Sequence, residues 1–419
     1  MKIALLRTII LVIIAVTVTM QQWHFESSQP PNDFGFFWTT VQFMKIYDRT
    51  DIFTEQGEQA INAAQPQPSG AFYTVTQTPF LYSFVSAVSS GNFATDARRF
   101  HAICLASFVL AAILLFWLFG YGPDSSLAVY ISIVLLFAPL AMDAQVASNN
   151  RIQLGLLALA AACIRFRSHF WHFAAGILFG LGVMFKPTTL FIPLLLLSSR
   201  AMRRQWRLMA VETAGCLAGI LLGFAAGAML FGTGSCWLDW ATRIGRLPID
   251  ASPLDLLNFS LPVLLKEITG ANFSTPVLVI GFSAAAWCIF RLTRTFQKNT
   301  ASCCIDDSGR ASLLFDLQVI ATGSTVYLLC ASLVWNHYYT FTLPLIILLL
   351  SPAWLRSQGV HMSAAAVLAA SALAVHIVIV MSGMLLLAGW LSWSAACVLF
   401  LLGTARPYPS CTASHPEIA

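Results

Sequence analysis

Long apolar runs recur along most of the chain and constrain its fold more than any other feature. A membrane-spanning helix needs about 20 apolar residues. Twelve candidate runs fall near 4–20, 102–119, 126–142, 153–164, 173–186, 188–199, 208–231, 276–291, 312–334, 340–355, 362–384 and 386–403. Hydrocarbon offers the backbone no hydrogen bonds, so such runs are expected to be helical. The sequence therefore predicts an all-α, polytopic integral membrane protein with about twelve transmembrane helices.

The composition agrees with a membrane protein and excludes several functions. Charged residues make up only 10% of the chain, against about 25% in soluble domains. The net charge of +5 comes from basic residues in short segments between apolar runs, so nucleic acid is not an expected partner. No His/Cys cluster has metal-ligand spacing, and no nucleotide-binding glycine motif is present. We expect neither a metal nor a cofactor.

Basic residues also predict the orientation of the spans. With a cytoplasmic N-terminus, the basic segments 165–167, 200–207 and 291–310 all fall on the inner side, as the positive-inside rule requires. The run 4–20 resembles a signal peptide, but no small-residue cleavage site follows, so an uncleaved span is expected. We predict a single transmembrane domain over 1–419 in the inner (plasma) membrane, with both termini cytoplasmic.

Two segments interrupt this simple pattern. The segment 78–91 is apolar but short, and we interpret it as a helix at the outer interface, because a full span there would place 165–167 outside. The run 173–199 is interrupted at Lys186 and Pro187. Proline breaks a helix and lysine is costly in lipid, so we interpret the run as two half-length helices that meet at the outer side. The alternative is one kinked helix with a snorkelling lysine.

Three outer segments are large enough to hold a site: 21–101, which would carry short interfacial helices, 143–153 and 232–275. The strongest candidate is Asp33, which precedes Phe34 and further aromatic residues. A partly shielded carboxylate at the mouth of a helical bundle could remove a proton from a substrate hydroxyl. That indicates an enzyme acting on a membrane-borne substrate. The alternative is a helix N-cap.

Other polar residues are expected on the same side. Lys186 lies in an apolar context and should have an anionic partner, such as a lipid phosphate. Asn150 and Arg151, in the second outer turn, could bind phosphate or sugar hydroxyls. His337 could donate to a phosphate oxygen, and Trp335 could contact a sugar. The alternatives are a snorkelling lysine, a plain polar turn and an aromatic interfacial belt.

Arg243 and Arg246 add positive charge to the third outer segment. They could reach a phosphate, or they could pair with Asp239 or Asp250 in the same segment. The residues alone do not decide between these interpretations.

The order of these features resembles the GT-C superfamily of polytopic glycosyltransferases and, within it, glycosyltransferase family 87, over about residues 1–355. The resemblance rests on Asp33-Phe34, the aromatic segment 72–81, the polar turn 148–153, the stretch 175–187 and Trp335-Asn336-His337. The stretch 175–187 is the closest match, and the basic segment 200–207 follows it as in the family. Two parts depart from the family pattern: 72–81 lacks the Tyr-Pro-Pro sequence, and the polar turn lacks its glycine.

The resemblance implies a GT-C-like fold and an inverting transfer of a hexose, mannose above all, from a polyprenyl-phosphate-sugar donor. The acceptor would be a glycolipid or glycan on the outer, extracytoplasmic side, with membrane lipids as further partners. The implied roles are a general base at Asp33, donor-phosphate contacts at Lys186, His337 and Arg151, and sugar or acceptor contacts at Tyr73, Asn150 and Trp335.

Two other functions fit parts of the pattern. A transporter or flippase for an anionic or lipid-linked substrate would also use a broken helix with a lysine, but it should show paired breaks in its two halves. A glycan polymerase or ligase usually has a large late outer loop, whereas 335–339 is short.

Overall fold

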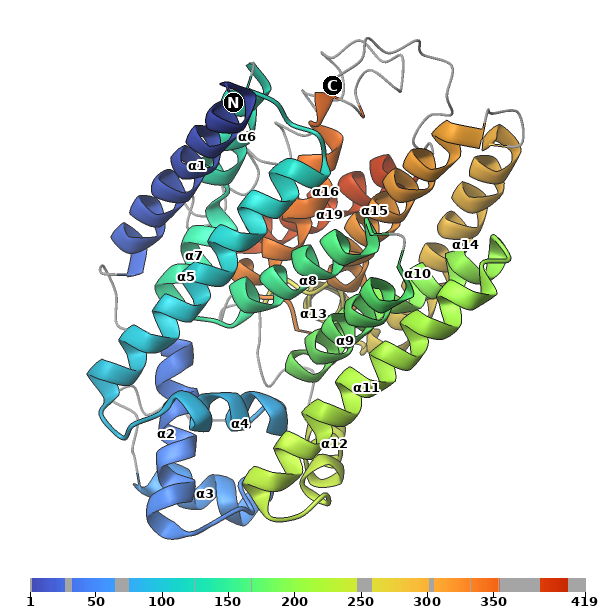
Figure 1. The fold of residues 1–419 in the computed structure, drawn as a ribbon. Helices are drawn as coiled ribbons and strands as arrows, with labels where there is room; N and C mark the ends of the chain where they lie inside the picture. The colour runs from blue at the N-terminus through green and yellow to red at the C-terminus, as the bar shows by residue number, and fades with distance from the viewer. Residues whose placement is uncertain are drawn as a thin grey trace.

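The computed structural model describes residues 2–26, 32–64, 75–123, 125–166, 168–246, 258–300, 305–331, 333–352, 354 and 385–405. Helices dominate these ranges (Figure 1). They are α1 (Lys2–Glu26), α2 (Asn32–Tyr47), α3 (Glu55–Ala64), α4 (Pro79–Val88), α5 (Phe93–Leu118), α6 (Ser125–Leu136), α7 (Ala138–Val146), α8 (Asn150–Ile164), α9 (His169–Phe185), η1 (Pro187–Leu190), α10 (Phe191–Met202), α11 (Trp206–Phe231), α12 (Cys236–Arg246), α13 (Leu261–Thr269), α14 (Ser274–Thr300), α15 (Ile305–Cys330), η4 (Asn336–Thr342), α16 (Leu343–Leu349) and α19 (Leu385–Ala405). The fold class predicted from the sequence is confirmed as all-helical.

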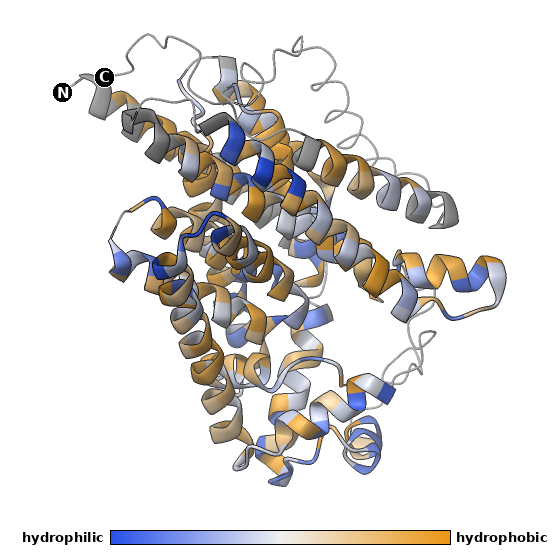
Figure 2. Cartoon of the chain, turned by 90° about the vertical axis from the view of Figure 1, so that its right-hand side faces the viewer, coloured by the Kyte–Doolittle hydropathy of each residue, from blue (hydrophilic) through white to orange (hydrophobic). Residues whose placement is uncertain are grey.

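Hydrophobic residues cover most of the length of these helices (Figure 2). Among the described residues, four helices are long and apolar enough to cross a membrane, namely α5, α11, α14 and α15, and the bent pair α6 and α7 brings the number to five. The chain is thus a membrane protein, but the predicted count of twelve spans is not confirmed. Several predicted spans are shorter apolar helices, among them α8, α9 and the η1–α10 segment. The predicted span 362–384 lies outside the described residues.

Two predicted spans have a different local structure. The run near 126–142 breaks at Phe137, where α6 and α7 meet at a bend of 44°. Pro139 lies in the first turn of α7, where its missing N–H is tolerated, and it cannot continue the preceding helix. The run near 340–355 was also predicted as one helix. It forms the 3₁₀-helix η4 and then α16, which has only 7 residues.

The interruption at Lys186 produces a helical hairpin. Lys186 is extended, with φ −152° and ψ 102°, and Pro187 begins η1. At the other end of the hairpin, His172 near the start of α9 and Arg200 near the end of α10 both contact Glu212, at 2.8 and 3.0 Å. The chain therefore returns after Lys186. This confirms the prediction of two helices that meet at the lysine and excludes a single kinked helix.

The predicted inner turns lie together at this far end of the hairpin. The Gln297 side chain donates to the Met202 carbonyl at 2.8 Å, which joins the end of α14 to the end of α10. Two of the arginines there are paired with a carboxylate. Arg200 is buried and lies 2.7 Å from Asp316, and Arg203 also pairs with that carboxylate.

Glycines hold α9 tightly against α11. A Cβ atom on Gly176 would lie 2.3 Å from the Glu212 carbonyl oxygen, and one on Gly180 would lie 2.2 Å from that of Cys216. Gly219 on α11 faces α9 in the same way. Small residues at such spacing let two helix backbones approach closely in a membrane. The stretch 175–187 therefore fixes the helix that ends at Lys186.

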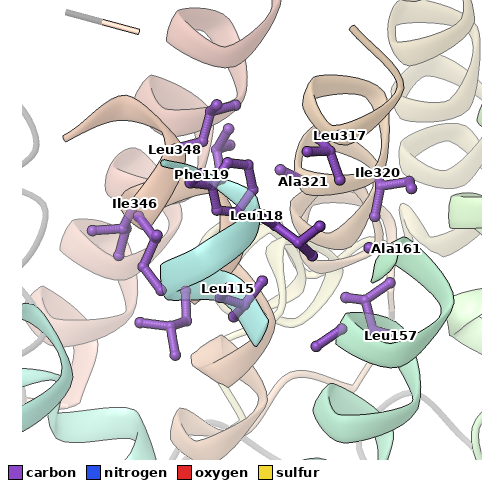
Figure 3. Packing of buried hydrophobic residues seen from close by; sticks show 14 of the residues in the cluster. Leu115, Leu118, Phe119, Leu157, Ala161, Leu317, Ile320, Ala321, Ile346 and Leu348 are labelled. Carbon is purple, nitrogen blue, oxygen red and sulfur yellow. The ribbon is translucent and has the colours of Figure 1, made fainter. Parts of the chain in front are cut away.

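The largest hydrophobic cluster lies between α5, α8, α15 and α16. Figure 3 shows its contacts, with Leu115 and Leu118 from α5, Leu157 and Ala161 from α8, Leu317 and Ile320 from α15, and Ile346 and Leu348 from α16. All of these side chains are nearly inaccessible to solvent. This core fixes the helices whose near ends carry the polar residues described next.

Candidate active site

Asp33 lies in the first turn of α2, where the helix dipole favours a carboxylate. The helix is fixed by its aromatic residues. Phe34 is fully buried and stacks on Phe100 of α5, with ring centroids 4.7 Å apart. One turn later, the Trp38 indole donates to the buried Asp96 carboxylate at 3.0 Å. The position of Asp33 thus depends on the contact between α2 and α5.

The surroundings of Asp33 are polar but poorly hydrated. Its Oδ2 atom lies 3.7 Å from His337 Nε2, and its side chain is 16% exposed. Burial raises the pKa of Asp33 from 3.8 to about 7. A hydrogen bond from Ser148 lowers this pKa, the charge of Asp143 raises it and that of Lys186 lowers it, each by less than burial does.

The α7–α8 connection brings Asp143 into the site. The chain turns at Ala147, whose φ is 54°, and α8 begins at Asn150. Asp143 accepts from Asn150 Nδ2 at 2.8 Å and from Arg151 Nε at 3.1 Å, and the paired carboxylate and guanidinium are 0% exposed. Asn150 and Arg151 were predicted in an open polar turn. Instead they form the buried first turn of a helix.

The Lys186 side chain extends from the end of α9 to Asn150. Its Nζ donates to Asn150 Oδ1 at 3.1 Å and lies 2.8 Å from the centroid of the Tyr338 ring. The rings of Tyr327 and Phe341 are each 5.9 Å away. Within the part of the chain that the structure describes, Lys186 has no ion pair. Its amino group instead contacts an amide oxygen and aromatic faces.

The segment before η4 is fixed by backbone pairing. Asn258 and Trp335 form an isolated antiparallel bridge, and the Phe259 amide donates to Val334 at 2.7 Å. The His337 carbonyl accepts from Asn150 Nδ2 at 3.3 Å. Within the described ranges, His337 Nε2 and Trp335 Nε1 are buried without a hydrogen bond. Burial lowers the pKa of His337 well below its usual range, so this imidazole is neutral near pH 7.

The structure thus brings four of the predicted site residues together: Asp33, Asn150, Lys186 and His337. The Trp335 ring is 5.6 Å from that of His337, between centroids. The Arg151 guanidinium is paired with the Asp143 carboxylate. Tyr73 lies outside the described residues. No group of three or more His, Cys, Asp or Glu residues in the described ranges could hold a metal ion.

Sequence reasoning missed three contributors to the site, Asp143, Ser148 and Tyr338. Asp143 could have been found, because a carboxylate inside an apolar run requires a partner and usually has a function. Ser148 lies in the polar turn 148–153 and Tyr338 follows His337, but the sequence does not show that they reach Asp33 and Lys186. Arg243 pairs with Glu58 of α3, a carboxylate that the sequence did not suggest as its partner.

Residues 76–305 match the model of glycosyltransferase family 87, which is more than half of the 419-residue chain. No curated protein and no solved structure matches the chain. The matched range includes Asp143, Asn150 and Lys186. Asp33 and His337 lie outside it, so the family match does not cover them, and the structure places them beside these residues.

Proposed function

Because the chain belongs to glycosyltransferase family 87 and is therefore a glycosyltransferase, we propose that it transfers a hexose, mannose in the first instance, from a polyprenyl-phosphate donor. The acceptor is a hydroxyl of a glycolipid or glycan on the extracytoplasmic side of the inner membrane. The observation that carries this proposal is the convergence of a carboxylate, a neutral imidazole and a lysine from three separate elements, at Asp33, His337 and Lys186.

In this proposal Asp33 is the general base. As the acceptor oxygen bonds to the anomeric carbon, Asp33 takes the hydroxyl proton and the bond from that carbon to the phosphate oxygen breaks. A single displacement of this kind inverts the anomeric configuration. A pKa of about 7 suits the role, because about half of the carboxylate is ionised at neutral pH and it is more basic than an exposed one.

The departing polyprenyl phosphate gains negative charge, and Lys186 and His337 are placed to stabilise it. An ammonium group has three donors, and one of those on Lys186 bonds to Asn150, which leaves two for phosphate oxygens. Neutral His337 can donate through Nε2, which has no other hydrogen bond among the described residues. Donors held in place before the reaction are often the largest source of rate enhancement.

The remaining predicted residues have different parts in this proposal. Arg151 acts through Asp143, because its guanidinium is fully buried against that carboxylate. Asn150 has both ends of its amide bound within the protein, so it supports the donor site. Trp335 Nε1 is a buried donor without a partner among the described residues and is suited to a sugar hydroxyl. Tyr73 is proposed as a sugar contact from the family resemblance alone.

The test is sugar transfer by purified protein in detergent, with radiolabelled polyprenyl-phosphate mannose and a membrane lipid extract as acceptor source. Asp33→Asn should lose about 10²–10⁴-fold in rate, the usual effect of removing a general base. Asp48→Asn is the matched control, because Asp48 follows the other end of α2, is exposed and has a φ of 50°, which asparagine tolerates well. Transfer that survives Asp33→Asn would refute the assignment of the base, and absence of transfer by folded wild type would refute the donor.

A further inference from the structure

Asp143 is a fully buried carboxylate at this site. It lies near the C-terminal end of α7, and its two oxygens have different partners. Oδ1 accepts from Asn150 at 2.8 Å and Oδ2 accepts from Arg151 at 3.1 Å. Because its side chain is 0% exposed, it cannot touch a substrate without a change of structure. Its effect on the reaction must pass through neighbouring groups.

The first of these neighbours is the Asn150 amide. An ionised carboxylate only accepts hydrogen bonds, so it orients the NH₂ group of Asn150 toward itself. The amide oxygen is then turned toward Lys186, from which it accepts at 3.1 Å. The same NH₂ group donates to the His337 carbonyl at 3.3 Å. One amide orientation therefore places both Lys186 and η4.

The second connection runs to the base itself. The Asp143 backbone carbonyl accepts from the Ser148 amide at 3.2 Å, across the left-handed turn at Ala147. The Ser148 hydroxyl donates to Asp33. Asp143 thus contacts, through one residue in each case, all three groups that the proposed reaction uses.

We propose that Asp143 is a positioning residue for sugar transfer: through the Asn150 amide and the 147–148 turn it holds Lys186 and His337 in register with Asp33. This inference rests on the proposed function, because it assumes that these groups act on donor and acceptor. Arg151 supplies the opposite charge that keeps the Asp143 carboxylate ionised in a buried place.

A merely structural role for Asp143 makes a different prediction. If the pair with Arg151 only joined α7 to α8, breaking it would lower stability without a selective change in kinetics. If Asp143 positions Lys186, an Asn150→Leu variant should reproduce the kinetic defect while the Asp143–Arg151 pair stays intact. This variant removes the amide that orients the lysine and leaves no charge unpaired.

The test measures kcat and KM for polyprenyl-phosphate mannose from pH 5 to 9 in wild type, Asp143→Asn, Asp143→Glu and Asn150→Leu. Asn150→Leu should raise the donor KM about tenfold, the usual loss for one hydrogen bond to a charged group. The acid limb of its kcat/KM profile, the fall in kcat/KM toward low pH, should not move, because no charge has changed. Asp143→Asn should raise KM similarly and move the acid limb about one pH unit lower, and Asp143→Glu should restore part of the activity.

The direction of that movement follows from the charges near Asp33. The charged or titratable groups that interact with it are Asp143, Lys186, His337 and Tyr338. Removing the negative charge of Asp143, and leaving Arg151 uncompensated, both favour the ionised form of Asp33. Its pKa, and with it the acid limb, must fall.

Three results would overturn the proposed role of Asp143. An Asp143→Asn variant that folds and keeps the wild-type donor KM and acid limb overturns the inference alone. If that variant does not fold, an unchanged donor KM in Asn150→Leu overturns it. Absence of transfer by wild type overturns the proposed function, and this inference with it. Folding of each variant is monitored by its thermal unfolding in the same detergent.

Discussion

Asp33→Asn should abolish transfer and at the same time stabilise the protein at pH 8. The physical reason is the poorly hydrated position of the carboxylate. Burial raises the Asp33 pKa from 3.8 to about 7, which means that the folded protein favours the protonated, neutral side chain. Each pKa unit corresponds to about 1.4 kcal/mol, so the ionised form costs the folded state up to about 4 kcal/mol. Asparagine has the same shape without the charge.

The pH dependence of this gain follows from linkage. A raised pKa contributes stability that is complete below the unfolded value, near pH 4, and is lost as pH rises through about 7. The difference between variant and wild type should therefore be largest above pH 7. It should shrink by about 1.4 kcal/mol for each pH unit below 7 and vanish near pH 4.

Thermal unfolding in detergent at pH 8, 6 and 4.5 measures this prediction. In a chain of this length, 1 kcal/mol moves the midpoint by about 1–2 °C, so the gain at pH 8 should be about 4–8 °C. Asp48→Asn should show no such gain at any pH. If Asp33→Asn is inactive but no more stable than wild type at pH 8, the carboxylate is already compensated in the native protein, and a base with a pKa near 7 is the wrong explanation of the site.

Three further predictions concern the site and its support. The acid limb of kcat/KM in wild type should lie near pH 7, with a tenfold loss for each pH unit below it, because Asp33 must be ionised to act; a rate that is constant down to pH 5 would contradict this. Gly180→Ala should lower stability by about 2–3 kcal/mol through its clash with the α11 backbone, whereas Gly245→Ala, with open space around it, should be neutral or slightly stabilising; thermal unfolding compares the two. Arg200→Met should cost about 3–5 kcal/mol by leaving Glu212 partly uncompensated, yet the folded variant should keep its donor KM, because this pair lies at the far end of α9.

Features carried by single residues in an apolar context could be predicted from the sequence. Lys186 and Pro187 mark a break because each is unfavourable inside a membrane helix, and the structure has two helices that meet there. Asp33 could be selected because carboxylates are scarce and aromatic residues surround it. That these residues lie beside His337 could be expected only from the family resemblance, because about 150 residues separate Lys186 from the histidine.

Pairing between distant charges could not be predicted. Arg200 and Arg203 were expected on the inner side, but the sequence does not reveal that Asp316, more than 100 residues later, pairs with both. The same limit applies to Arg243, whose partner in the structure is Glu58, 185 residues earlier. A charge pattern gives the side of the membrane on which a residue lies, whereas its partner depends on packing.

The two ends of α9 explain why the proposed phosphate-binding lysine is placed accurately enough to act. His172 fixes one end against Glu212, and Lys186 lies about 20 Å away at the other. Between them, Gly176 and Gly180 hold the helix backbone against α11. Lys186 is therefore positioned by a helix that is fixed along its length. Asp33 depends instead on α2 and its contacts with α5. Lys186 and Asp33 are joined through the region where α7 and α8 meet. In the proposed reaction, Asp143 and the turn that follows α7 therefore set the geometry between the proposed base and the leaving group.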